Sequence, residues 1–411
     1  SQLTSREPGT VGAALYDARS WCGIIVDGFH VDPLVLRLAL RAAPLRRFML
    51  VTDAMPSVGG RSKDFTLNGE LISARDGRCV STDGTIAGSD LDMATAVRNC
   101  VDLLGLDLAQ AAMLASANPA AFLGLDGEQG SWDAAGVVVL PIPYESTVSY
   151  QGGTKLGPAA IIEASRYIEL YDQELDAEPG PEIGVCTLPA LHLTSAGPEA
   201  AVRELRGAYD AVLEAAGDRL VIGLGGEHSI SSAPVLAHAA RLGDGGRLSV
   251  LQFDAHGDLR LEYEGSPWSH AAVMARCIDD VDLVQVGIRA ITSEERQLIR
   301  ERDSITTIFA DEMWRDDAWI DRAMAALGDT VFITFDVDYF DPSLMPATGT
   351  PEPGGPAWYP TMQLLRRVFT EKKVVGVDVV ELAPIGGNAA PDFVVAKLVY
   401  KMVGYRWLSK R

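Results

Sequence analysis

The fold is decided by residues 248–258, which read Leu-Ser-Val-Leu-Gln-Phe-Asp-Ala-His-Gly-Asp. The first six residues form a short apolar run, typical of a strand that is buried on both faces of a sheet. Asp254, His256 and Asp258 follow directly, at alternate positions. This arrangement is typical of a parallel α/β sheet, in which functional side chains gather beyond the carboxyl ends of the strands.

Five further runs of the same kind lie on either side of this one. Amphipathic stretches such as 199–216 separate several of them and indicate helices. Strands that alternate with helices predict a three-layer α/β/α fold with a mostly parallel sheet. The five runs are Val137–Leu140, Leu220–Leu224, Leu283–Gly287, Val331–Phe335 and Val374–Val380.

Acidic or imidazole side chains follow four of the six runs, including the first one, 248–253. His228 lies in the segment Gly-Gly-Glu-His-Ser after one run, Asp336 and Asp338 follow another, and Glu381 follows a third. If the four strands are neighbours, these side chains meet at one rim of the sheet. Four ordinary turns with acidic caps are the simpler alternative, but four such turns together favour a site.

Carboxylates and imidazoles without a thiolate suit Mn²⁺ or a similar divalent ion. None of the five cysteines lies in these turns, which argues against a structural zinc site. Counting Glu381, the rim carries five carboxylates, more negative charge than one divalent ion balances. The sequence therefore predicts two ions that share carboxylates and activate a water for attack on carbon or phosphorus.

The charge of the rim bears on the substrate. Arg260 is the one Lys or Arg in these turns, whereas a phosphate substrate favours cationic clamps. A carboxylate-rich pocket favours a cation, and Glu381 can pair with a guanidinium in a bidentate fork. A guanidino substrate is therefore preferred, and a phosphoesterase is the alternative.

Composition excludes several classes of protein. The 411 residues are 47% hydrophobic and carry a net charge of −21, which excludes a disordered chain and disfavours a non-specific nucleic-acid binder. Apolar stretches are too short for a membrane helix, and the scattered cysteines indicate reduced thiols in the cytoplasm. The turn-rich segment 124–136 suggests two domains, 1–131 and 132–411.

Six motifs, in order along the chain, resemble the ureohydrolase family of arginase and agmatinase over residues 137–411, which implies an arginase-like fold for that part. The opening stretch 141–158 also resembles the first strand and loop of that family. The motifs are Gly225–Ser229, Asp254–Arg260, Ser269–Ala271, Asp336–Pro342, Met345–Gly355 and Glu381–Pro384.

The resemblance implies a role for each matching residue. His270 is expected to carry a proton to the leaving amine, and Glu381 to hold the guanidinium with Thr350 nearby. Two Mn²⁺ ions are expected, bridged by two shared aspartates. The first set of ligands is His228, Asp254, Asp258 and Asp336, and the second is His256, Asp254, Asp336 and Asp338.

Within the family, the motifs look most like those of agmatinase, which converts agmatine into putrescine and urea. Aminopropylagmatine, guanidinobutyrate and arginine are alternative substrates. The family often forms trimers or hexamers, so a homo-oligomer is expected. A non-catalytic binding protein is a further alternative, but all six matching Asp and His positions are present.

Residues 1–131 resemble the C-terminal part of N-acetylglucosamine-6-phosphate deacetylase, an amidohydrolase. This implies a partial barrel in which Asp53 matches the catalytic acid/base and His30 and Arg6 match substrate-binding positions. The metal ligands of that family precede its Arg-Glu-Pro-Gly motif, here Arg6–Gly9, with which the resemblance begins. The segment is therefore expected to be a truncated, inactive remnant that arose by gene fusion, frameshift or a gene-calling error, with retained deacetylase activity as the alternative.

Overall fold

The computed structural model describes residues 7–17, 20, 22–58, 60, 62–67, 69–75, 77–117, 121–125, 127–316 and 318–411. Contacts divide the chain into two compact units, Ser1–Ala120 and Ala121–Arg411. The division falls upstream of the boundary near residue 132 that composition suggested. Phe122 and Leu123 explain this difference, since both are buried in the core of the second unit.

The second unit contains an eight-stranded sheet in which every neighbouring pair is parallel. The strand order is β12-β11-β10-β13-β14-β9-β7-β8. Six strands match the apolar runs, whereas the short β8 and the threonine-rich β12 gave no such signal. The strands are β7 (Val137–Ile142), β8 (Val185–Thr187), β9 (Leu220–Gly225), β10 (Leu248–Phe253), β11 (Val281–Ile288), β12 (Ile305–Phe309), β13 (Thr330–Asp336) and β14 (Lys373–Val380).

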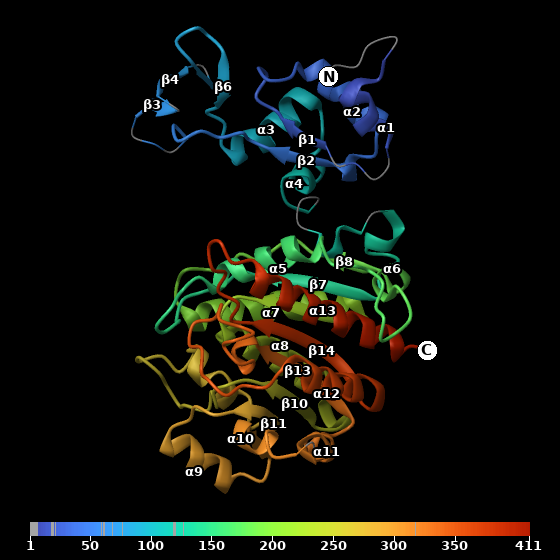
Figure 1. The fold of residues 1–411 in the computed structure, drawn as a ribbon, viewed down its shortest axis with the longest axis vertical. Coiled ribbons are helices and arrows are strands. Elements are labelled where there is room, and N and C mark those ends of the chain that lie inside the picture. Colours follow the sequence, from blue (N-terminus) through green and yellow to red (C-terminus); the bar gives the residue numbers. More distant parts are fainter. Residues whose placement is uncertain are drawn as a thin grey trace. The chain divides into compact units, whose positions relative to one another are not determined.

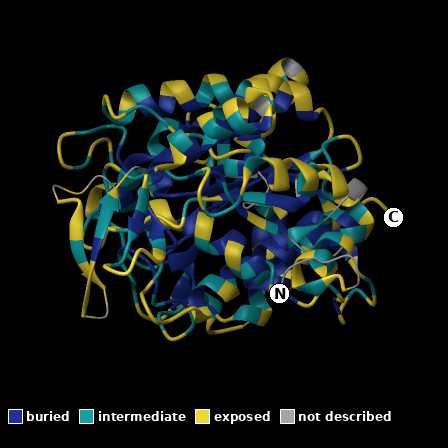
Figure 2. Cartoon of the chain, turned by 90° about the horizontal axis from the view of Figure 1, so that it is seen from above, coloured by how far each residue is buried: buried dark blue, intermediate teal, exposed yellow. Residues whose placement is uncertain are grey.

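Helices cover both faces of this sheet, and the predicted three-layer fold is confirmed (Figure 1). Within β7, Val137 and Val139 face one core, while Val138 and Leu140 face the other. Because both faces are covered, strand residues are buried throughout, as the dark blue strands at the centre of Figure 2 show.

The helices divide between the two faces of the sheet. One layer contains α5 (Gly157–Ser165), α6 (Pro179–Ile183), α11 (Ala318–Ala326), α12 (Trp358–Glu371) and α13 (Ala390–Leu408). The other contains α7 (Pro198–Ala216), α8 (Ser232–Leu242) and α9 (Ser293–Glu301). The short α10 (Ala310–Met313) follows β12. Helix α7 matches the predicted amphipathic stretch 199–216, with Leu205, Tyr209 and Leu213 on its buried side.

The strand order brings together the four strands that end in polar residues. Strands β10, β13, β14 and β9 are consecutive in the sheet and run in the same direction. Their carboxyl ends therefore form one rim, as the sequence required for a single site.

The first unit has its own small core and two sheets. Strands β1 (Cys22–Ile25) and β2 (Phe48–Val51) are parallel and are connected through α2 (Pro33–Ala42), which is the repeating unit of an α/β barrel. The turn-rich stretch 66–86 lies in an antiparallel sheet of β3 (Asp64–Leu67), β4 (Glu70–Arg75), β5 (Arg78–Val80) and β6 (Ile86–Ser89). The other helices are α1 (Gly9–Tyr16), α3 (Met93–Leu104) and α4 (Leu108–Ala112).

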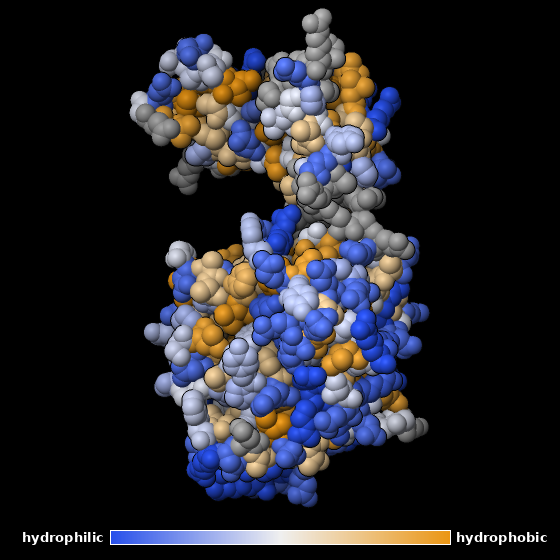
Figure 3. All heavy atoms as spheres, turned by 45° about the vertical axis from the view of Figure 1, so that its right-hand side comes forward, coloured by the Kyte–Doolittle hydropathy of each residue, from blue (hydrophilic) through white to orange (hydrophobic). Residues whose placement is uncertain are grey.

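Hydrophilic side chains dominate the face of the second unit that Figure 3 shows, most densely toward its lower end. Within the described ranges, no helix combines the length and the apolar composition that a bilayer crossing needs.

His238 on α8 makes the stability of the second unit sensitive to acid. Its ring lies 5.9 Å from that of Tyr209 and 5.4 Å from that of Phe332, and burial lowers its pKa to about 4. Above pH 6.5 the ring is neutral in both states. Below pH 6.5 the His238 ring binds a proton in the unfolded chain but not in the folded chain. The free energy of unfolding should therefore fall by about 1 kcal/mol per pH unit down to pH 4.

Urea unfolding at several pH values, with chelator present, measures this slope. Tryptophan fluorescence is suitable because six of the seven tryptophans lie in the second unit. His238→Leu should flatten the slope between pH 6 and 4, while the exposed His192→Leu should leave it unchanged. Equal slopes in the wild type and His238→Leu would contradict the prediction.

Candidate metal centre

The predicted ligands converge at the rim formed by β9, β10, β13 and β14. His228 begins a 3-10 turn three residues after β9 ends, and Asp254 follows β10 directly. Asp336 is the last residue of β13, and Asp338 lies in the turn that follows. All of them except His256 are buried.

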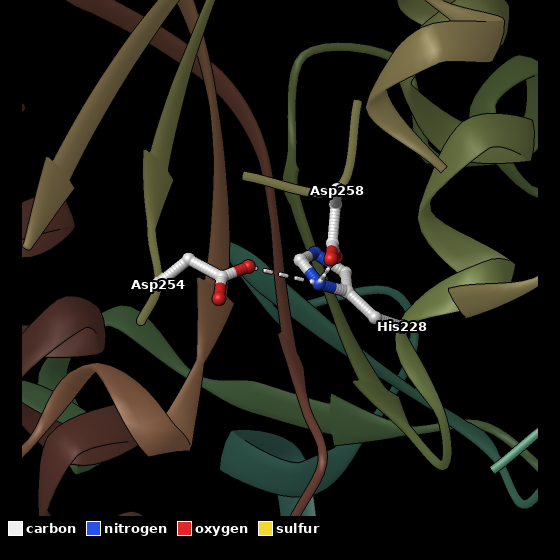
Figure 4. A group of neighbouring side chains, drawn as sticks. All are labelled: His228, Asp254 and Asp258. Atoms are coloured by element: carbon white, nitrogen blue, oxygen red, sulfur yellow. Dashed lines mark ion pairs between the residues drawn. The ribbon is translucent and has the colours of Figure 1, made fainter. Parts of the chain in front are cut away.

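The first group of close donor atoms surrounds the Nδ1 atom of His228. That nitrogen lies 2.9 Å from Asp258 Oδ2 and 3.2 Å from Asp254 Oδ2, and Figure 4 shows both carboxylates pointing at the imidazole. The candidate ligand atoms of these three residues lie within 4.8 Å of one another. Asp336 lies beside this group, with Oδ2 3.4 Å from the same nitrogen.

A second group contains Asp254, His256 and Asp338, again with ligand atoms within 4.8 Å of one another. His256 Nδ1 lies 2.9 Å from Asp338 Oδ2 and 3.7 Å from Asp254 Oδ1. Asp254 belongs to both groups, so its two oxygens can bridge two cations. The backbone N–H groups of Ala255 and His256 donate to Asp338 and Asp254 and fix both carboxylates.

The hydrogen bonding of His228 fits a metal ligand. Its Nε2 lies 2.9 Å from Thr334 Oγ1, whose hydroxyl donates to Asp378 Oδ1 at 2.6 Å. Nε2 must therefore be the donor to Thr334, and Nδ1 of the neutral ring presents a lone pair to the carboxylates. Nδ1 is buried with no hydrogen-bond partner among the described residues. A lone pair that faces carboxylates requires a cation or a proton between them.

The pKa shifts of the candidate ligands also indicate that protons or cations must lie between these side chains. Burial and the charge on Asp254 raise the pKa of Asp258 to about 7, and burial with the neighbouring Asp338 raises the pKa of Asp336 well above its usual value. Burial opposes a charge on His256, but Asp338 and Asp254 still raise its pKa to about 12. Cations that enter must displace these protons, so metal affinity rises with pH.

The same rim contains the residues expected to act on a substrate. A cavity of about 340 Å³ is lined by His270, Thr350 and Glu381 together with most of the candidate ligands. Glu381 Oε1 accepts the backbone N–H of His228 at 2.6 Å, which ties the end of β14 to the turn after β9. Burial raises the pKa of Glu381 well above its usual value, so a cationic group in the cavity would stabilise its charge.

His270 is held by a network centred on Glu227, a residue for which the sequence suggested no role. The fully buried Glu227 carboxylate accepts the backbone N–H of Ser146 and Thr147 and the Thr147 hydroxyl. Thr147 Oγ1 in turn accepts the backbone N–H of His270 and contacts its ring, and Ser149 Oγ lies 3.2 Å from Nε2. The sequence signal that could have identified Glu227 is its position next to the candidate ligand His228, within the glycine-rich motif Gly225–Ser229.

A row of buried polar side chains crosses the sheet beneath the ligands and was also missed. Gln252 is paired in register with Thr334, and Thr334 with Asp378. Gln252 Nε2 donates to Asp254 Oδ2 at 2.7 Å, just as Thr334 orients His228. The available signal was a polar residue inside the apolar runs that form β10, β13 and β14, where a buried polar side chain needs a partner.

Thr334→Val is expected to weaken metal binding by about 10- to 100-fold while preserving the fold, because it removes the acceptor that orients His228. Titration with Mn²⁺, followed by calorimetry, measures the affinity. Thr348→Val is the matched control, since Thr348 is equally buried and its hydroxyl finds no partner among the described residues. Equal affinities in the two variants would contradict this role.

In the first unit the structure brings Asp53 and His30 together. His30 Nε2 lies 3.5 Å from Asp53 Oδ2, and His30 Nδ1 lies 2.7 Å from Asp27 Oδ2. Arg6 lies outside the described residues. Among those residues, both groups able to hold a metal ion lie in the second unit.

Comparisons with known proteins agree with this geometry. The chain is 41% identical over 303 residues to the N(1)-aminopropylagmatine ureohydrolase of Synechocystis, covering 72% of this chain and 97% of that protein. The agmatine ureohydrolase of Thermoplasma volcanium has a TM-score of 0.59 and 27% identity, covering 71% of this chain and 94% of that one.

The first segment has a different relative. A stretch of 129 residues is 43% identical to the N-acetylgalactosamine-6-phosphate deacetylase of Escherichia coli O157:H7, covering 31% of this chain and 34% of that protein. The predicted resemblance to an amino-sugar phosphate deacetylase is thereby confirmed. Residues 135–404 match the model described as "Arginase family", and the chain therefore belongs to the arginase family.

Proposed function

We propose that the chain hydrolyses the guanidino group of an agmatine-type amine and releases urea, with two Mn²⁺ ions at the candidate metal centre. The observation that carries this proposal is the pair of donor groups that share Asp254 beside Glu381 in one cavity. His228, Asp254 and Asp258 would hold one ion. His256, Asp254 and Asp338 would hold the other, with Asp336 as the second bridge. When bound, such ions lower the pKa of water and supply a nucleophile at neutral pH.

The protein's own residues would bind and orient the substrate. A guanidinium matches the two oxygens of Glu381 in a bidentate pair, and Thr350 lines the same cavity. Burial lowers the pKa of His270, so its imidazole is neutral at neutral pH. His270 can then accept a proton and deliver it to the departing amine nitrogen as the carbon–nitrogen bond breaks.

Agmatine is the substrate that the sequence motifs suggest, with putrescine as the second product. N(1)-aminopropylagmatine is the strongest alternative, because the Synechocystis relative named for that substrate is 41% identical. Both carry a guanidinium at the end of a cationic amine chain, which suits a cavity lined by carboxylates. Guanidinobutyrate and arginine each add a carboxylate, which such a cavity disfavours.

Urea release from the purified full chain with Mn²⁺ tests the proposal. We expect release from agmatine or N(1)-aminopropylagmatine, and comparison of kcat/KM identifies the preferred amine. Guanidinobutyrate and arginine should be poor substrates. Urea release from none of the four would contradict the proposal and support a non-catalytic binding protein.

Two further expectations concern the whole chain. We expect no acetate release from N-acetylglucosamine or N-acetylgalactosamine 6-phosphate, and its detection would support a second activity in the first unit. We also propose a cytoplasmic homo-oligomer, a trimer or hexamer. Light scattering coupled to size-exclusion chromatography measures this state, and a monomeric mass would contradict it.

A further inference from the structure

A second cavity, of about 580 Å³, lies at the edge of the sheet opposite the metal centre. It is formed at the amino ends of β9 and β14, where the carboxyl-terminal ends of α7, α8, α12 and α13 also meet. The end of α13 is marked by the C-terminus in Figure 1. We propose that this cavity binds a small ligand that carries two or more phosphate groups.

The charge of the cavity contrasts with that of the chain. Only 35 of the 411 residues are Lys or Arg, and the net charge is −21. Of the sixteen residues that line this cavity, six are Lys or Arg and one, Asp218, is acidic. The six cations are Arg219, Arg241, Lys372, Lys373, Arg406 and Lys410.

None of these six cations forms a salt bridge with a carboxylate within the described part of the chain. Three of them donate to backbone carbonyls, Arg219 to Trp132, Lys372 to Leu327 and Arg406 to Asp218. These bonds hold the half-buried cations in place without neutralising them. Arg241, Lys373 and Lys410 are exposed, so their charges can reach a ligand that enters.

Two buried polar atoms in the wall also have no partner among the described residues. They are Nε2 of His238, a side chain that is only 7% exposed, and Nε of Arg406. A buried nitrogen without a partner is costly unless a ligand or water satisfies it. Both atoms are covered by the protein, with His238 Nε2 against Gly376 of β14, so the direct contacts to a ligand would come from the exposed cations.

Cations near helix carboxyl-terminal ends also have a structural use, because they offset the helix dipoles. Each helix end carries about half a negative charge, so four ends cancel about two of the six positive charges. Asp218 cancels one more, and an excess of about three positive charges remains. A monoanion would leave most of this excess uncompensated, whereas a ligand with two or more phosphates balances it and offers oxygens to guanidinium forks.

Calorimetric titration of the full chain with pyrophosphate tests this inference. The chain is first treated with chelator, so that the probe cannot bind through the metal centre. A parallel titration of the same chelator-treated chain uses inorganic phosphate. We expect one pyrophosphate per chain and weaker binding of phosphate.

The double variant Arg241→Gln/Lys373→Gln should weaken pyrophosphate binding by about tenfold or more. Arg315→Gln/Arg322→Gln removes the same charge from exposed ion pairs elsewhere in the second unit and should leave the affinity unchanged. No saturable binding, or equal weakening in both double variants, would overturn the inference. Because the readout is binding to a chain without metal, it is independent of the proposed hydrolysis.

Discussion

Asp254→Asn is expected to reduce urea release by at least about 1,000-fold, which corresponds to a loss of about 4 kcal/mol of transition-state stabilisation. Asp254 is fully buried, and it is the one residue that belongs to both donor groups. Asparagine has the same shape, and its carbonyl oxygen can still accept the backbone N–H of His256, although its NH₂ group replaces the oxygen that accepts from Gln252. The loss therefore reports the missing charge between two cations rather than a collapsed fold.

Metal content and urea release, measured on the same preparation, check this prediction. The wild type should contain two Mn²⁺ per chain, and Asp254→Asn fewer. Asp282→Asn is the matched control, because Asp282 lies on β11 of the same sheet but pairs with Arg247 at the surface. An Asp254→Asn chain that keeps two ions and wild-type turnover would contradict the proposed bridging role.

Glu381→Gln should lower kcat/KM by about 100- to 1,000-fold, because a bidentate charged pair with the guanidinium becomes a neutral hydrogen bond. The glutamine oxygen can still accept the backbone N–H of His228, which Glu381 accepts at 2.6 Å. The turn that carries His228 should therefore stay in place. Metal content should remain at the wild-type value.

A second carboxylate that lines the same cavity provides the comparison. Glu352 is also part of the cavity wall, and Glu352→Gln removes the same charge. If Glu381 pairs with the guanidinium, Glu352→Gln should change kcat/KM by less than about tenfold. Similar losses in the two variants would show that the overall negative potential, and not Glu381 itself, selects the substrate.

The sequence could single out the candidate ligands because their signals are local. Asp254, His256 and Asp258 lie at alternate positions of one short segment, and Asp336 and Asp338 repeat that spacing. Glu227, Thr334 and Asp378 were missed for the opposite reason. Each is recognisable only by its partner, and Glu227 holds a loop about 80 residues away in the chain.

The cavity at the amino ends of β9 and β14 is a second feature that the sequence did not reveal. Its six cations are spread from Arg219 to Lys410 and come from four separate segments of the chain. Helix ends from four different segments bring them together. A charge pattern of this kind exists only after the chain has folded.

By itself, the sequence determined the α/β class of the second unit and the types of side chain that gather at its candidate site. Apolar runs that end in Asp, His or Glu specify buried parallel strands and hard, metal-binding side chains through local patterning alone. Only the tertiary structure decided that β9 lies beside β14, and β14 beside β13, although long stretches of chain separate them. Strand neighbours are selected by the packing of both helix layers on the whole sheet, and that long-range burial leaves no periodic trace in any one segment.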